Sequence, residues 1–210
     1  MSSYLSEDEQ VEAFKKWWKE NGTSVIAGAV LGFAIIFGWQ GWDAYSTAQG
    51  ENASILFTSM ENQLAAGQQE QGIETAKRLI GEYSNSVYAT FAALQMAKLS
   101  YEQGEKDAAR QHLQWSMENA PDTALSELAR LRLARLLIDM QQLDEAAVLT
   151  AGAGELMPGE FAMLRGDIAR QRGDAGEAEN AYREALELGV EDQQLLRMKL
   201  VDLGVEEPAS

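Results

Sequence analysis

The chain has 210 residues, 46% of them hydrophobic, which suffices for one ordinary domain with a packed core plus an appendage. It has no cysteine and a single histidine, so disulfides and cysteine-based metal sites are excluded, and histidine-dependent catalysis or metal binding is disfavoured. The net charge of -16 repels nucleic acid and argues against a nucleic-acid partner.

The first 22 residues precede a long apolar stretch and carry a helical pattern of their own. Ser6 and Glu9 have the spacing of a capping box. Apolar residues follow at helical spacing among lysines: Val11, Phe14 and Trp18. We expect residues 1–22 to form a cytoplasmic amphipathic segment on the inner leaflet of a membrane. A simple cytoplasmic extension of the following helix fits the same pattern.

Residues 21–42 carry no charged side chain, and we place a transmembrane helix at 23–42 within them. At 1.5 Å per residue, a helix of this length spans roughly 33 Å, which matches a hydrocarbon core of about 30 Å. Aromatic side chains prefer the two membrane interfaces. They flank both ends of this stretch: Trp17, Trp18, Trp39, Trp42 and Tyr45.

The lysines predict the orientation of the span. Lys15, Lys16 and Lys19 precede it, and the first basic residue after it is Lys77. Because positively charged flanks stay in the cytoplasm, the N-terminus is predicted to be cytoplasmic and the rest of the chain to lie across the membrane. In a Gram-negative bacterium that compartment is the periplasm.

A cleaved signal peptide is the competing interpretation of the apolar stretch. Ser-Thr-Ala at residues 46–48 resembles a small-x-small cleavage site. A signal peptide, however, has an apolar region of about 7 to 15 residues, and this stretch is longer. We therefore favour a retained anchor.

Small residues recur every four positions inside the span, at Ser24, Gly28 and Gly32. Such a stripe lets two membrane helices approach closely. It predicts packing against a partner's helix or against a second copy of this chain, giving a homo-oligomer. The alternative is that glycine is simply frequent in membrane helices.

We expect a polar hinge at 43–55, followed by a helical repeat domain at 56–210. A small or compact apolar residue is followed twelve positions later by alanine in four successive pairs: Leu64 and Ala76, Ala97 and Ala109, Ala134 and Ala146, Gly166 and Ala178. Each pair is expected to straddle a turn, at 71–72, 104–107, 141–144 and 173–176. Small residues at these positions would let two helices cross closely.

A period near 34 residues with two helices per unit is typical of tetratricopeptide solenoids. The first unit fits least well, because Leu64 stands where the other units have a small residue. Residues 193–203 are expected to form a closing helix over the last unit. The predicted fold class is all-α, with one transmembrane helix followed by a tetratricopeptide-like solenoid. A generic helical bundle is the alternative.

Sequence motifs of catalysis are absent from the chain. There is no P-loop, no Gly-x-Ser-x-Gly, no His-Glu-x-x-His and no dinucleotide fingerprint. Acidic residues are so dense that neighbouring pairs arise by chance on solvated helix faces. We therefore expect a protein that is not an enzyme and needs no cofactor or metal.

Stacked helix pairs present a concave surface that binds peptides or partner helices. By spacing, the candidate groove includes Phe91, Lys98, Tyr101, Arg135 and Arg170. Its basic residues stand out in an acidic chain and predict a groove for acidic or extended segments. Local ion pairing with neighbouring carboxylates is the alternative role for these cations.

The order of motifs along the whole chain supports a resemblance. Residues 10–22 read Gln-Val-Glu-Ala-Phe-Lys-Lys-Trp-Trp-Lys-Glu-Asn-Gly, and the glycine-rich span ends in Gly-Trp-Gln-Gly-Trp at 38–42. Degenerate repeats follow, and residues 196–203 read Leu-Arg-Met-Lys-Leu-Val-Asp-Leu. This arrangement resembles the YfgM family of Gram-negative bacteria over nearly its full length.

The resemblance implies an ancillary subunit of the SecYEG translocon in the bacterial inner membrane. It also implies association with the periplasmic chaperone PpiD and a role in linking translocated proteins to periplasmic folding factors. A second hypothesis is a membrane-anchored regulator that sequesters an envelope-stress signalling component. A third is a soluble periplasmic scaffold released by cleavage.

Overall fold

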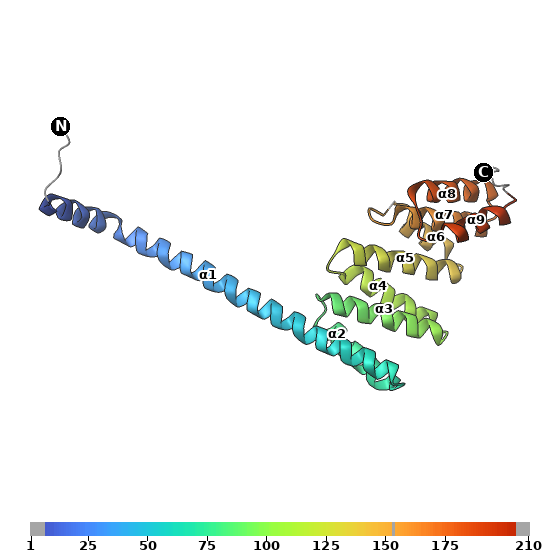
Figure 1. Cartoon of the computed structure of the whole chain (residues 1–210), viewed down its shortest axis with the longest axis horizontal. Helices are drawn as coiled ribbons and strands as arrows, with labels where there is room; N and C mark the ends of the chain where they lie inside the picture. Colours follow the sequence, from blue (N-terminus) through green and yellow to red (C-terminus); the bar gives the residue numbers. More distant parts are fainter. Residues whose placement is uncertain (1–6, 153, 205–210) are drawn as a thin grey trace. The chain divides into compact units, whose positions relative to one another are not determined.

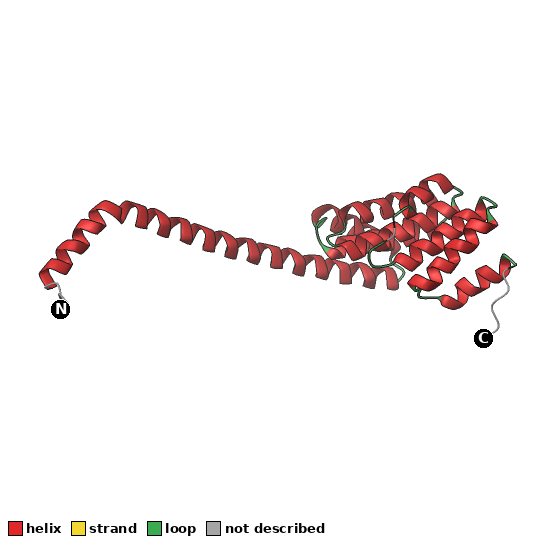
Figure 2. Ribbon diagram, turned by 90° about the horizontal axis from the view of Figure 1, so that it is seen from above, coloured by secondary structure: helices red, strands yellow, loops and turns green. Residues whose placement is uncertain are grey.

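The computed structural model describes residues 7–152 and 154–204, and within these ranges every regular element is a helix (Figures 1 and 2). Ser6 of the expected capping box lies outside the described residues. The chain divides into two compact units, residues 1–51 and residues 52–210. The predicted all-α class is confirmed, and the predicted solenoid is found in the second unit.

The first unit consists of the N-terminal part of α1 (Glu7–Ala65), which contains the predicted span. Large apolar side chains in and around that span are exposed, including Ile35, Phe37, Trp39 and Trp42. The helix is long and apolar enough to cross a membrane. An uncovered apolar surface of this kind is favourable in hydrocarbon and unfavourable in water.

Residues 43–55, expected as a hinge, are helical throughout, so the structure differs from the prediction there. The segment is polar but contains no proline, and most of its residues are tolerated in a helix. Gly50 alone costs about 1 kcal/mol relative to alanine, which is too little to break a helix extended on both sides. The cleavage-like residues 46–48 belong to the same helix.

The second unit is a row of helix pairs. The end of α1 pairs with α2 (Gln69–Glu82), and α3 (Val87–Glu102) pairs with α4 (Lys106–Asn119). The next pairs are α5 (Thr123–Asp139) with α6 (Leu143–Thr150) and α7 (Pro158–Gln171) with α8 (Ala175–Leu188). A last helix, α9 (Gln193–Asp202), packs on α8. Figure 1 shows α3 to α8 stacked in chain order.

The turn inside each pair has one repeated geometry. A residue with positive φ follows the first helix: Gly67, Gly104, Gln141 and Gly173. The next backbone N–H then donates to the carbonyl five residues earlier, as from Glu105 to Ser100 at 2.8 Å and from Asp174 to Ala169 at 2.9 Å. This is the Schellman arrangement, which satisfies carbonyls left free at a helix end. It reverses the chain within a few residues.

The first turn lies at Gly67, whereas the sequence pattern placed it at 71–72. Gly72 is instead a buried residue of α2. A Cβ atom on Gly72 would lie 2.5 Å from Cδ2 of Leu64. Because glycine has no side chain, Gly72 on α2 leaves room for the large Leu64 at the first crossing.

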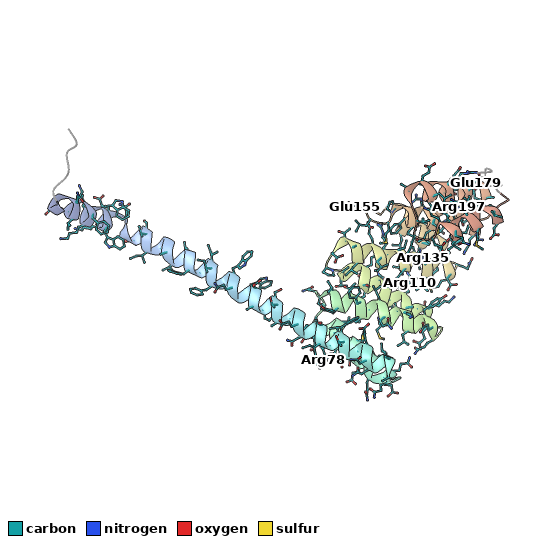
Figure 3. All side chains as sticks on the ribbon, in the orientation of Figure 1. Arg78, Arg110, Arg135, Glu155, Glu179 and Arg197 are labelled. Carbon is teal, nitrogen blue, oxygen red and sulfur yellow. The ribbon has the colours of Figure 1, made fainter. Side chains whose placement is uncertain are left out.

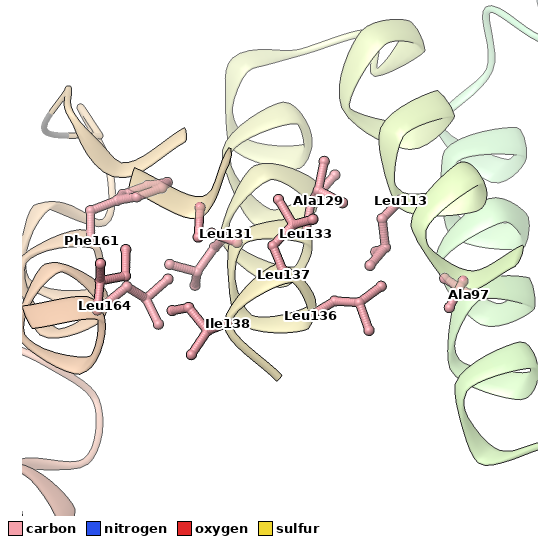
Figure 4. Packing of buried hydrophobic residues seen from close by; sticks show 14 of the residues in the cluster. Ala97, Leu113, Ala129, Leu131, Leu133, Leu136, Leu137, Ile138, Phe161 and Leu164 are labelled. Atoms are coloured by element: carbon pink, nitrogen blue, oxygen red, sulfur yellow. The ribbon is translucent and has the colours of Figure 1, made fainter. Parts of the chain in front are cut away.

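The alanines predicted at the crossings are buried. Ala76, Ala134, Ala146 and Ala178 are fully covered, and Ala97 and Ala109 are nearly so. Figure 4 shows Ala97, Leu113 and Leu136 from α3, α4 and α5 facing a common space. In the last pair, a Cβ on Gly166 would lie 2.3 Å from Cε1 of Tyr182, whose ring is completely buried. Small residues thus set the helix separation.

The third pair departs from the others because α6 has only 8 residues. The chain after it is held by Glu127, a carboxylate on α5 that is 7% exposed. Its oxygens accept hydrogen bonds from the backbone N–H groups of Glu155 at 2.6 Å and Leu156 at 3.0 Å. A buried carboxylate is tolerated when donors satisfy it in this way.

The left-handed turn at Gln141 gives a stability prediction. A side chain at positive φ is strained by roughly 1 kcal/mol, and glycine relieves that strain. We expect Gln141→Gly to raise the free energy of unfolding by about 0.5 to 1 kcal/mol in urea unfolding of the detergent-solubilised chain. Gly104→Ala should lower it by a similar amount. A loss of stability in Gln141→Gly would contradict the assigned geometry.

The crossing of α7 and α8 gives a second prediction. In Gly166→Ala the added methyl overlaps the Tyr182 ring, so we expect a loss of about 1 to 3 kcal/mol in the same measurement. Gly81→Ala is the matched control, because a Cβ on Gly81 of α2 meets no atom within 4 Å. That variant should be neutral or up to about 1 kcal/mol more stable. Equal effects of the two substitutions would refute the close crossing.

Candidate interaction surface

A cavity of about 340 Å³ opens between α3, α4 and α5, and we call it the α3–α5 cavity. Its floor is apolar and is formed by Leu94, Ala97, Ala109, Leu113 and Leu136. Polar side chains form its rim: Lys98, Tyr101, Arg132, Arg135 and Asp139. The predicted groove residues Lys98, Tyr101 and Arg135 therefore share one cavity.

Helical spacing explains this arrangement. On α3, Leu94, Lys98 and Tyr101 are separated by four and three residues, which places them on one face. On α5, Arg132 and Arg135 are three residues apart and share a face in the same way. Ala97 and Ala109 contribute small side chains to the floor where α3 and α4 cross, so the floor holds less side-chain volume at that point.

The single carboxylate of the rim is neutralised. Lys106 Nζ lies 2.7 Å from Asp139 Oδ2, and the Tyr101 hydroxyl donates to the same oxygen at 3.3 Å. The hydrogen bond with Lys106 lowers the pKa of Asp139, and the same bond raises the pKa of Lys106. Both groups therefore stay charged over the physiological range, and the pair adds no net charge to the rim.

The cations of the rim differ in their partners. Arg135, which Figure 3 labels on α5, pairs with Glu160 at 2.6 Å. Lys98 lies 3.8 Å from Glu102, and the two side chains are 65% and 58% exposed, so that pair is weak. Arg132 has no ion pair within the described part of the chain. Among the described residues, local ion pairing is therefore close for Arg135, weak for Lys98 and absent for Arg132.

Two of the predicted groove residues lie elsewhere. Phe91 belongs to an aromatic cluster with Phe57, whose ring centroid is 6.0 Å away and which also contacts Tyr88. Arg170 is exposed on α7 and lines none of the described cavities. The predicted groove is therefore divided into an aromatic patch, the α3–α5 cavity and an isolated arginine.

A second, larger cavity of about 600 Å³ lies between α5, α7 and α9. Within it, Asp167 pairs with Lys199 of α9 and accepts a hydrogen bond at 2.7 Å from the Tyr182 hydroxyl. Burial raises the pKa of Tyr182, so the phenol stays protonated and keeps donating. Asp167 joins α7, α8 and α9, which is a structural role.

Sequence reasoning missed Arg132, Lys106 and Lys199. Arg132 could have been found, because it lies three residues before Arg135 on the same helix face. Lys106 and Lys199 reach their partners from other helices, Asp139 and Asp167, across packing that spacing within one helix does not reveal.

The stripe at Ser24, Gly28 and Gly32 lies on α1. A Cβ built on Gly28 or Gly32 would meet no atom within 4 Å. The stripe has room for a close neighbour in the membrane. Among the described residues, no group of three or more histidine, aspartate or glutamate side chains could hold a metal ion.

Comparison with known proteins first identifies the class. The family model of the tetratricopeptide repeat-like domain matches residues 15–205. The match begins before the apolar span and runs through α9, so it covers the anchor as well as the repeats. This range includes most of the chain.

Curated relatives then identify the family. A protein of Haemophilus influenzae is 30% identical over 97% of this chain, and one of Escherichia coli is 27% identical over 98% of it. A Neisseria gonorrhoeae protein is 28% identical over 97% of the chain. Each is named an ancillary SecYEG translocon subunit, and each is covered over 100% of its own length. The chain belongs to this family, as the resemblance predicted.

Proposed function

We propose that this chain is a non-enzymatic scaffold subunit that accompanies the SecYEG translocon in the bacterial inner membrane. The proposal rests on the alignment of this chain with relatives that carry this name. Each of these relatives is aligned over its whole length. An association with the translocon requires a membrane anchor, and the exposed apolar part of α1 fits one. The repeats supply binding surface without catalytic groups.

In the proposed topology, residues 23–42 cross the bilayer in contact with lipid. The segment before them lies in the cytoplasm and the repeat domain in the periplasm. Lys15, Lys16 and Lys19 support this direction, because the next basic residue is far along the chain. Trp39 and Trp42 are 77% and 74% exposed, as expected of rings at the outer interface.

The repeat domain then receives translocated proteins and links them to periplasmic chaperones, PpiD among them. The α3–α5 cavity supports this part of the proposal, because it is an open apolar surface bordered by incompletely paired cations. A tether that holds this surface near the exit of the translocon raises the local concentration of the binding site around emerging chains.

The small-residue stripe gives α1 a docking role in addition to its role as a tether. We propose that Ser24, Gly28 and Gly32 face a helix of the translocon or of PpiD. The uncovered space at both glycines supports close approach of such a helix. Pairing with a second copy of this chain would use the same stripe.

Photo-crosslinking from within the membrane tests the proposal. A photoreactive residue is placed at Gly28 or Gly32, with Val30 on the opposite helix face as the matched control. We expect crosslinks to translocon subunits or PpiD from the two glycine positions and at least about fivefold fewer from Val30, because only the stripe permits close contact.

Each other outcome has a clear meaning. Crosslinks confined to an envelope-stress signalling protein would overturn the translocon role in favour of a regulator. Crosslinks confined to a second copy would show that the stripe serves a homo-oligomer. A shortened chain, lacking the first 48 residues by intact mass, would replace the anchor with a released periplasmic scaffold.

A further inference from the structure

We infer that the α3–α5 cavity binds an extended acidic peptide segment that inserts one apolar side chain between α3 and α5. The inference deepens the proposed function, on which it rests, by naming the chemistry of the bound partner. It depends on three observations: the size of the cavity, the contrast between floor and rim, and the incomplete pairing of the rim cations.

The size of the cavity limits what can enter it. Its volume of about 340 Å³ lies at the small end of the range for ligand sites, roughly 300 to 1,000 Å³. The cavity is an open hollow lined by α3, α4 and α5 and is not closed around a ligand. This space suits one large side chain and its neighbouring backbone better than a whole cofactor.

The floor selects an apolar side chain. Leu94 is 5% exposed, and Leu113 and Leu136 are each 6% exposed, so these side chains form the core surface at the base of the cavity. Figure 4 shows Leu113 and Leu136 among the packed core residues. Tyr101, which is 48% exposed, supplies an aromatic wall. Covering these atoms with a leucine or phenylalanine side chain removes apolar surface from water and favours binding.

The rim selects carboxylates on either side of that side chain. It carries three cations and one carboxylate, and Lys106 neutralises the carboxylate. The whole chain shows the reverse balance, with 17 basic and 33 acidic residues. Arg132 has no ion pair in the described ranges, and the 3.8 Å contact of Lys98 with Glu102 is easily exchanged. An incoming aspartate or glutamate gains charge-assisted hydrogen bonds at both positions.

The surrounding acidity also argues against an intramolecular role for these cations. A cation that merely balanced the domain would sit close to one of its many carboxylates, as Arg135 does with Glu160 and Arg172 does with Asp144 at 2.6 Å. Arg132 instead borders an apolar hollow. Repulsion by the acidic remainder of the chain would further favour this basic rim as the place where an acidic ligand binds.

The test uses the full-length protein in nanodiscs of zwitterionic lipid and a fluorescein-labelled peptide, Gly-Ser-Asp-Glu-Leu-Glu-Asp-Ser-Gly. Each of two control peptides changes one feature. In the first, alanine replaces leucine. In the second, asparagine and glutamine replace the two aspartates and the two glutamates. We expect fluorescence anisotropy to show saturable binding of the parent peptide and at least about tenfold weaker binding of each control. Raising salt should weaken binding of the parent peptide.

A pair of protein variants locates the site. Arg132→Glu should weaken binding of the parent peptide about tenfold, because an attractive rim charge becomes repulsive. Lys77→Glu makes the same charge change at an exposed position of α2, outside the cavity, and should leave the affinity within about twofold. Both side chains are exposed, and unchanged circular dichroism will show that both variants fold.

The inference is overturned if the parent peptide does not bind, if the amide peptide binds equally well, or if both variants weaken binding equally. These results are separable from failure of the proposed function. The Arg132→Glu variant that carries the photoreactive residue at Gly28 should still crosslink to the translocon, because the cavity and the membrane stripe are independent sites. Peptide binding without any such crosslinking would retain the cavity site and reject the translocon role.

Discussion

The repeat domain depends on the close approach of two helices inside each pair, which is possible only where side chains are nearly absent. Ala97 meets α4 near Ala109, and Ala134 meets α6 near Ala146, all within one packed cluster. Cores tolerate little change in volume at such contacts. Where a large side chain does occur at a crossing, the facing position is glycine: Gly72 against Leu64 and Gly166 against Tyr182.

The close crossing also determines where function is available. The next helix, α5, packs on α4, and α3, α4 and α5 together line a hollow. Core leucines form part of the floor of that hollow, and its rim is drawn from α3 and α5. The same residues that fold the domain therefore shape the candidate binding surface, and no dedicated loop or insertion is needed.

Periodicity was sufficient to predict the helix pairs, the crossing alanines and the closing helix, because each signal lies within one helix or one turn. Residues 43–55 are helical where a hinge was expected, because the segment is polar but lacks the residues that end helices. The turn at 71–72 was wrong for a related reason: Gly72 relieves contact with Leu64 and does not bend the chain.

Contacts between pairs could not be predicted in the same way. Nothing in the sequence distinguishes Glu127 from the many surface carboxylates. In the structure it accepts hydrogen bonds from the backbone N–H groups of residues 155 and 156, which lie beyond the next helix. The partner of Asp139 is Lys106 on α4, and the partner of Asp167 is Lys199 on α9. Such side-chain contacts depend on how successive helix pairs stack. Helical spacing therefore predicted only part of the candidate site: it found Lys98, Tyr101 and Arg135, and it did not find Arg132.

In the proposed topology the repeat domain and the N-terminus lie on opposite sides of the membrane, and compartment-specific thiol labelling tests that topology most directly. The absence of cysteine means that each single substitution introduces a unique thiol. A membrane-impermeant maleimide applied to intact spheroplasts should label Gln95→Cys, exposed on α3, and should reach Lys16→Cys only after lysis. Labelling of Lys16→Cys before lysis, with Gln95→Cys protected, would contradict the account.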